Sequence, residues 1–229
     1  MTKRWSRGSG TLVAAVLAGL GAAAPAAAQE LADFDYENLR FRGVGLDWGY
    51  MWPTRVEPTQ SWGIRMDLGY LGPGVRVLPS LSYWSAPFKR AEVSELEGRV
   101  AELIATQTEG PAPDVDLGVI EWSDIKIGMD AQVVWDVPGN LLTFAGLGAA
   151  AHLLNGDGAA INGTFIEDLL DSVTAGFNLH AGLEYPVSNR VRLHGQGRYE
   201  VLGDLRYLQV RTGIQFMFGD LMPGEERTR

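Results

Sequence analysis

Residues 208–218 read Leu-Gln-Val-Arg-Thr-Gly-Ile-Gln-Phe-Met-Phe, and their polarity changes at nearly every second position. Successive side chains of a β-strand point to opposite faces. One face therefore carries Leu208, Val210, Thr212, Ile214, Phe216 and Phe218, whereas the other carries Gln209, Arg211, Gly213 and Gln215. The pattern predicts a strand with one face suited to hydrocarbon and the other suited to water.

The same alternation recurs along the chain and predicts eight strands. We place them at residues 41–52, 61–70, 74–85, 122–137, 140–152, 172–186, 190–201 and 204–218. Short tight-turn sequences such as Pro138-Gly139 follow the even-numbered predicted strands. Longer loops such as 86–121 and 153–171 follow the odd-numbered ones. Only the last odd connection, at Gly203, is short. This sorting of turns and loops is typical of outer-membrane barrels.

Composition limits the possible classes of function. The chain has 229 residues, no cysteine and a formal net charge of −9. The lack of cysteine excludes disulfides and removes the usual sulfur ligands of metals, and the acidic charge disfavours nucleic-acid binding. We therefore expect no metal, no cofactor and no nucleic-acid partner. After residue 28 no uncharged apolar run approaches the roughly 18 residues of a membrane helix, so a membrane form must be a closed barrel.

Charged residues on the polar faces number six positive and six negative. An unpaired ion in hydrocarbon costs several kcal/mol, so a membrane barrel must keep these groups paired inside it. The competing interpretation is the solvated face of a soluble sheet. The predicted lumen charge network consists of Asp47, Arg65, Asp67, Arg76, Asp124, Lys126, Asp130, Glu184, Arg192, Arg198, Glu200 and Arg211.

Aromatic residues on the apolar faces gather near the strand ends. Such rings favour the two interfaces between membrane and water. We expect one girdle at the long loops, formed by Tyr50, Trp52, Trp62, Tyr83 and Tyr199. We expect a second girdle at the short turns, formed by Tyr70, Trp135 and Tyr185, with Phe218 beside them.

The closing strand resembles the C-terminal assembly signal of outer-membrane barrels, with Arg211, Gly213, Phe216 and Phe218 in the signal positions. With the N-terminal leader and the turn at 184–190, the chain resembles the small outer-membrane β-barrel superfamily of OmpA-, OmpX- and OmpW-type barrels. The resemblance implies an all-β fold. The architecture that the resemblance implies is an eight-stranded antiparallel up-and-down transmembrane barrel with short periplasmic turns and longer external loops. The chain departs from the family in the eleven residues that follow Phe218.

We divide the chain into four parts. Residues 1–28 are expected to be a cleaved signal peptide, because Lys3, Arg4 and Arg7 precede an apolar run that ends at Ala26-Ala27-Ala28. An uncleaved membrane anchor is the alternative. Residues 29–40 are expected to be a periplasmic segment, 41–218 the barrel in the bacterial outer membrane, and 219–229 a short tail.

The longest loop predicts a helix at about 94–107. Ser94 and Glu97 have the spacing of a capping box, and apolar residues then recur at helical spacing, although Gly98 weakens the pattern. This helix is either a recognition surface, a lid over the barrel mouth or an element that packs on neighbouring loops.

Eight strands enclose an interior that side chains just fill. We therefore expect a structural or interaction protein. The alternative, by resemblance to OmpW-type barrels, is a narrow channel for small hydrophobic solutes, in which the many glycines would thin the packing. A lipid-modifying enzyme that uses His180 and His194 near Glu184 is a third hypothesis. The expected partners are membrane lipid, lipopolysaccharide and, during insertion, the barrel-assembly machinery; we expect a monomer.

Overall fold

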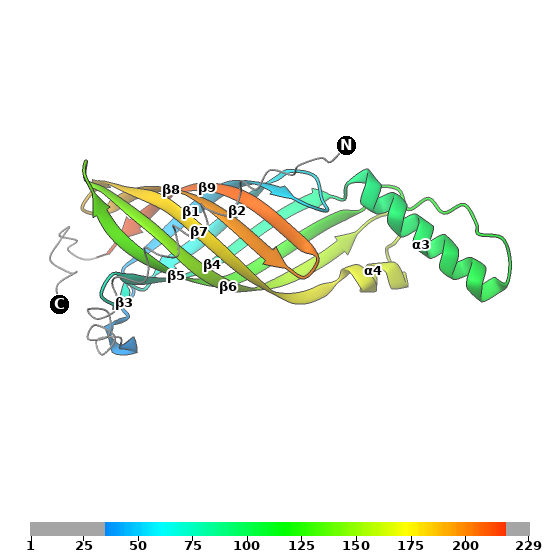
Figure 1. The fold of residues 1–229 in the computed structure, drawn as a ribbon, viewed down its shortest axis with the longest axis horizontal. Helices are drawn as coiled ribbons and strands as arrows, with labels where there is room; N and C mark the ends of the chain where they lie inside the picture. The colour runs from blue at the N-terminus through cyan, green and yellow to red at the C-terminus, as the bar shows by residue number, and fades with distance from the viewer. Residues whose placement is uncertain (1–34, 219–229) are drawn as a thin grey trace, which may run out of the picture.

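The strands of the protein close into a barrel. The computed structural model describes residues 35–218. Its main strands follow the order β2-β1-β9-β8-β7-β6-β5-β4, all neighbours are antiparallel, and β2 also pairs with β4. That last pairing removes the open edges, and the predicted eight-stranded up-and-down barrel is confirmed (Figure 1). The strands are β1 (Gly43–Pro53), β2 (Thr59–Asp67), β3 (Tyr70–Gly72), β4 (Val75–Pro87), β5 (Glu121–Val137), β6 (Leu141–Asp157), β7 (Ser172–Ser188), β8 (Val191–Leu202) and β9 (Leu205–Met217).

The two ends of the barrel differ, and we call them the turn end and the loop end. At the turn end, β5 and β6 are joined by a tight turn in which Gly139 and Asn140 have φ angles of 93° and 59°. The one-turn helix η2 (Tyr36–Asn38) lies at this end beside β3. At the loop end, α3 (Arg90–Thr108) and α4 (Phe165–Leu170) extend past the strands (Figure 1). Gly203 and Asp204 form the shortest connection there among the described residues.

The polarity of the two faces of the barrel wall is the reverse of that in a soluble protein, with apolar residues outside and polar residues inside. Along β7 the outward residues Phe177, Leu179 and Leu183 are 49–68 % exposed, whereas the inward residues Asn178 and Glu184 are buried. The same alternation of exposed and buried residues follows β1, β5, β8 and β9. A continuous apolar surface of this extent is unstable in water but suits the hydrocarbon of a bilayer. None of the helices described between residues 35 and 218 has the length and apolarity to cross a bilayer.

The predicted second strand, 61–70, is wrong at its end. β2 stops at Asp67, and Gly69 turns the chain with a φ of 75°, which side chains larger than glycine rarely adopt. The chain then forms β3, in which Tyr70 pairs with Arg76, a residue that faces inward. Tyr70 consequently packs against an interior cluster rather than in the outer girdle predicted for it.

The loop-end structures also differ from the prediction. α3 starts at Arg90 rather than near Ser94 and continues through Gly98 without a break. The capping box is wrong, because Ser94 lies within the helix and Glu97 accepts a hydrogen bond from the Leu117 amide instead (3.0 Å). β6 runs five residues past its predicted end, and α4 was not predicted.

Candidate functional site

Opposite charges meet in the upper layer of the lumen, nearest the loop end. The Lys126 ammonium lies 2.5 Å from Glu200 Oε2, and the Tyr207 hydroxyl donates to the same carboxylate (2.9 Å). His152 joins this carboxylate to a second one, with Nε2 3.2 Å from Glu200 and Nδ1 2.7 Å from Asp124. All these groups are buried, and both carboxylates have partners within the layer, as buried charges require.

Two carboxylates organise the middle layer of the lumen. Asp47 accepts from Arg65 (2.9 Å) and lies 2.6 Å from His194 Nε2 and 3.9 Å from Arg211. Asp130, on the opposite wall, pairs with Arg198. The following residues complete the layer around Asp130: Asn178, whose amide donates to Asp130 (3.2 Å), and His180, whose Nδ1 lies 2.9 Å from Asn178.

Arg76 is the centre of the lower layer, nearest the turn end. Its guanidinium donates to both carboxylate oxygens of Glu184 and lies 3.5 Å from Asp67. Arg192, which is 15 % exposed, lies 3.7 Å from the same glutamate. The Gln215 amide donates to Asp67 (2.8 Å), so the second carboxylate also has two partners. Ion pairs thus bridge the lumen at three successive levels.

Apolar side chains close the lumen above and below the charged layers. At the loop end, a cluster that includes Met51, Trp84 and Trp122 fills the interior. At the turn end, Val134, Leu142 and Phe144 pack together with Tyr70. The enclosed cavity in the middle layer has a volume of only about 10 Å³. The described part of the lumen is therefore filled by side chains.

Inward glycines make room for the ion pairs. A Cβ at Gly148 would overlap Asp130 and Asn178, and a Cβ at Gly176 would lie 2.5 Å from His152 Nε2. The hypothesis that glycines thin the lumen toward a channel is wrong at these positions, because long charged side chains occupy the space.

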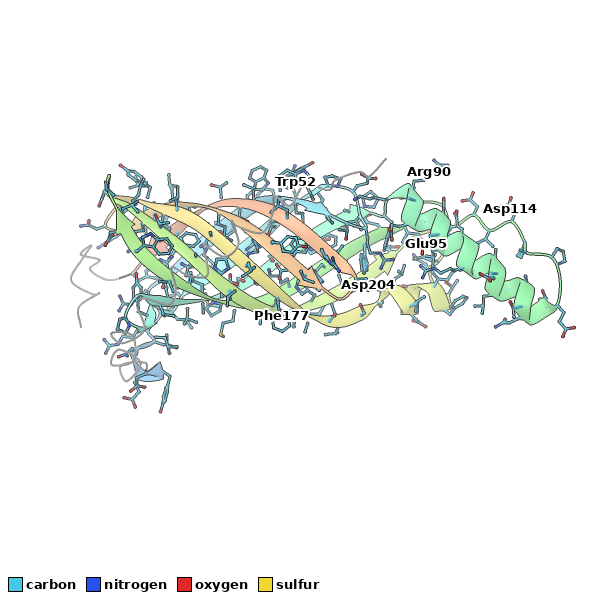
Figure 2. The ribbon with its side chains drawn as sticks, in the orientation of Figure 1. Trp52, Arg90, Glu95, Asp114, Phe177 and Asp204 are labelled. Carbon is cyan, nitrogen blue, oxygen red and sulfur yellow. The ribbon has the colours of Figure 1, made fainter. Side chains whose placement is uncertain are left out.

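A second feature lies outside the barrel, and we call it the platform: α3, residues 109–120 and α4. Val93, Leu96 and Val100 of α3 pack against Leu117, Ile120, Ile161 and Ile166. The helix therefore packs on its neighbouring loops, while its far half extends beyond the barrel (Figure 1). Glu95 and Asp114 lie on the exposed surface of the platform (Figure 2).

A polar cleft of about 470 Å³ lies where the platform meets the barrel. It is formed by the β1–β2 loop, the start of α3 and the β8–β9 turn. Arg55 donates to Glu92 across it (2.8 Å), and Arg99 and Arg206 are exposed beside it. Glu95 and Asp204 also line the cleft, so basic and acidic side chains both line it (Figure 2).

Comparison with solved structures identifies the fold. Neisserial surface protein A superimposes with a TM-score of 0.52 at 14 % identity, over 77 % of this chain and 97 % of that one. This is the fold of the small outer-membrane β-barrels. OprH from P. aeruginosa (TM-score 0.47, 16 % identity, 78 % and 99 % covered) and the attachment invasion locus protein of Yersinia pestis (0.46, 9 %, 79 % and 100 %) are more distant. No protein-family model matches the chain, and no curated protein matches its sequence.

The barrel places most predicted site residues on the expected faces. The twelve residues of the predicted charge network point into the lumen, and Arg192 alone is half-buried. On the outer face, Trp52 and Phe177 project from opposite sides of the barrel (Figure 2). Of the predicted girdle residues, Tyr50, Trp52, Trp62, Tyr83, Trp135, Tyr185 and Tyr199 lie on the outer face, and Tyr70 does not.

The residues of the predicted assembly signal lie on both faces of β9. Phe216 and Phe218 are exposed on the outer face, and Phe218 stacks on Phe41 with ring centroids 5.5 Å apart. Arg211 lies in the middle layer, and a Cβ at Gly213 would collide with the backbone of β1 and with His194. The glycine thus has a packing role as well.

His180 and His194 do not form the acid–base pair of the enzyme hypothesis. His180 and His194 contact Asn178 and Asp47 separately, and both are buried. His152, which the weak alternation of β6 concealed, contacts two carboxylates but lies beneath the apolar cluster of the loop end. Among residues 35–218, no group of three or more histidine or carboxylate side chains is arranged to hold a metal ion.

Proposed function

We propose that the protein is an integral outer-membrane protein whose sealed barrel holds an extracellular interaction platform in the cell surface. The observation that carries the proposal is the contrast between the interior of the barrel and the platform. Ion pairs and apolar clusters fill the interior, whereas the platform extends into solvent. A filled lumen counts against a channel for small solutes. Burial of the histidines counts against a lumenal enzyme site.

In this proposal the loop end faces the outside of the cell, and residues 1–28 are removed as a signal peptide. These residues and the tail 219–229 lie outside the part of the chain that the structure describes. The alternation of loop lengths supports the orientation, because the external loops of outer-membrane barrels are the longer ones.

Orientation can be tested on a cysteine-free background, since the natural chain has no cysteine. We expect a membrane-impermeant maleimide to label Glu102→Cys in α3 on intact cells. Asn140→Cys, at the turn end, should react only after the outer membrane is permeabilised. The reverse pattern, or equal labelling of both variants on intact cells, would refute the proposal.

We further propose that the polar cleft contacts the phosphates of lipopolysaccharide. Arg206 lies on the outer face of β9, two residues before Leu208, and therefore stands at the upper edge of the apolar belt. Arginine binds phosphate oxygens through two parallel hydrogen bonds. Arg99 approaches the same cleft from α3. The carboxylates there suit the divalent cations that accompany such phosphates.

The partner can be tested with purified lipopolysaccharide added to the refolded protein in detergent. We expect added lipopolysaccharide to raise the unfolding temperature of the natural protein and to have little effect on Arg99→Gln/Arg206→Gln. Arg190→Gln, an exposed change at the turn end, is the matched control and should retain the response. An unchanged response of the double variant would exclude the cleft.

A further inference from the structure

The short helix α4 is apolar on two sides, and only one of them packs into the platform. Ile166 is buried in the core of the platform, and Leu170 packs partly against the same cluster. Phe165 and Leu169, which lie on a neighbouring side of the helix at i and i+4 spacing, are 57 % and 67 % exposed. One side of α4 thus joins the platform core, whereas the other faces away from it.

Hydrogen bonds fix α4 at the edge of the barrel wall. The helix contacts β6 and is followed directly by β7 (Figure 1). Trp122 Nε1 donates to the carbonyl of Leu170 (3.2 Å), and the carboxylate of Asp171 accepts from the Gly156 amide (2.9 Å). These bonds hold the C-terminal end of α4 against the loop ends of β5 and β6.

This edge of the wall lies at the level of the membrane interface. A membrane-spanning strand takes about 9–11 residues, and along β7 that count from Tyr185 at the turn end reaches about residue 175. Val173, which is 76 % exposed, continues the outward apolar surface of β7 beyond Phe177 toward α4. The exposed side of α4 is therefore within reach of lipid headgroups and the upper part of the acyl chains.

The aromatic girdle at the loop end has a gap at the same place. Its residues lie on β1, β2, β4 and β8. On the described strands β5, β6 and β7, the outward positions nearest the loop end include Ser123, Asn155 and Val173, none of which is aromatic. Phe165 of α4 places an exposed aromatic ring beside these strands, where the girdle lacks one.

We propose that α4 is an interfacial membrane anchor, in which Phe165 and Leu169 insert between the lipids beside β6 and β7. Apolar helix faces bind at the boundary between headgroups and acyl chains. Asp168 is exposed on the side of α4 opposite Ile166, so its carboxylate remains among headgroups and water. The inference rests on the proposed membrane position of the barrel, but not on which end faces out of the cell.

The anchor gives the platform a fixed position relative to the bilayer. Ile166 belongs to the same cluster as Val93 and Leu96 of α3. A lipid contact on one side of α4 is therefore transmitted to α3 through the other side. The far half of α3 is then held at a set height above the membrane.

A cysteine-free chain permits one fluorescent probe at a chosen site. Leu169→Cys, Asp168→Cys and Phe177→Cys are each labelled with the NBD fluorophore and refolded into phosphatidylcholine nanodiscs, which leave both barrel ends accessible. For Leu169→Cys we expect emission at shorter wavelength than for Asp168→Cys, quenching by doxyl-labelled lipids and protection from aqueous iodide. Asp168→Cys is the matched control and should be quenched by iodide.

Phe177→Cys, in the apolar belt, separates two possible failures. Suppose that iodide quenches Leu169→Cys, whereas only the doxyl-labelled lipids quench Phe177→Cys. The barrel is then in the membrane and the anchor is wrong, because α4 faces solvent or a protein partner. Iodide quenching of Phe177→Cys as well would overturn the membrane position of the barrel together with the anchor.

Proteolysis in the same nanodiscs tests whether the lipid contact holds α4 in place. We expect Phe165→Ser/Leu169→Ser to be cut faster within residues 157–171 than the natural protein, with unchanged heat-modifiable mobility of the barrel. Leu103→Ser/Ile104→Ser, which changes two exposed apolar residues in the far half of α3, is the matched control. It should leave that rate unchanged. Equal cutting of this segment in both double variants would contradict the anchor.

Discussion

Gly148 lies opposite Asp130 in the ladder between β6 and β5, and a methyl group on Gly148 would overlap the Asp130 carboxylate. The carboxylate is held there by Arg198 of β8, a strand that β7 and β6 separate from β5. A small residue on one strand is thus required by an ion pair that two other strands complete. The lumen is packed by such combinations of glycine and long charged side chains.

The first prediction concerns this pair. Gly148→Ala should lower the free energy of unfolding by ~1–3 kcal/mol, because the added methyl group displaces Asp130 from Arg198. Gly197→Ala is the matched control, since Gly197 faces outward and a Cβ there meets nothing within 4 Å. Urea unfolding in lipid vesicles, followed by heat-modifiable gel mobility, measures both. Equal stability of the two variants would contradict the packing described.

The second prediction concerns the lower layer. Arg76→Met or Glu184→Met alone should destabilise the barrel by ~3–5 kcal/mol, because each leaves a buried charge without its main partner. The double variant should be more stable than either single one. The half-exposed pair Arg55–Glu92 is the control, and the same cycle there should give under ~1 kcal/mol. Additive losses at Arg76 and Glu184 would show that the pair is not coupled.

The third prediction concerns the apolar belt. Met129 and Ser123 share the outward face of β5, but Met129 lies near the middle of the belt and Ser123 near the loop end. Met129→Arg should cost ~2–4 kcal/mol, because arginine at the bilayer midplane loses its hydration. Ser123→Arg should cost less than ~1 kcal/mol. Similar costs at the two positions, measured by unfolding from bilayers, would argue against the proposed membrane position.

Much of the wall could be predicted from the sequence, because one-residue alternation fixes the face of each side chain once a strand is recognised. The alternation fails where the chain turns. Gly69 reverses the side on which Tyr70 lies, and nothing in the local pattern of residues 61–70 indicates that reversal. In β6 the run Ala149-Ala150-Ala151 has no contrast, so His152 could not be assigned to the lumen.

The partners inside the lumen could not be predicted either. Arg76 contacts Glu184 across 108 residues of sequence, and that contact depends on the stagger of the whole barrel rather than on either strand. The apolar clusters at the two ends were missed for the same reason. Trp84 and Trp122 have inward parity, but only the closed barrel shows that they meet.

The fourth prediction concerns assembly. Phe216→Ala/Phe218→Ala should reduce the amount of folded protein in the membrane, because both rings belong to the proposed assembly signal at the end of β9. Phe41→Ala removes only the ring that stacks on Phe218 and should assemble normally. Heat-modifiable protein in outer-membrane fractions is the measurement. Normal levels of the double variant would leave the signal assignment without support.

The sealed lumen is tested most directly by conductance of the refolded natural protein in a planar bilayer. Because three layers of ion pairs and two apolar clusters fill the interior, we predict no discrete current steps above those of protein-free membranes. A large porin added to the same bilayer confirms that channels can be detected. Reproducible unitary steps from the natural protein would contradict a filled barrel and would favour a narrow channel instead.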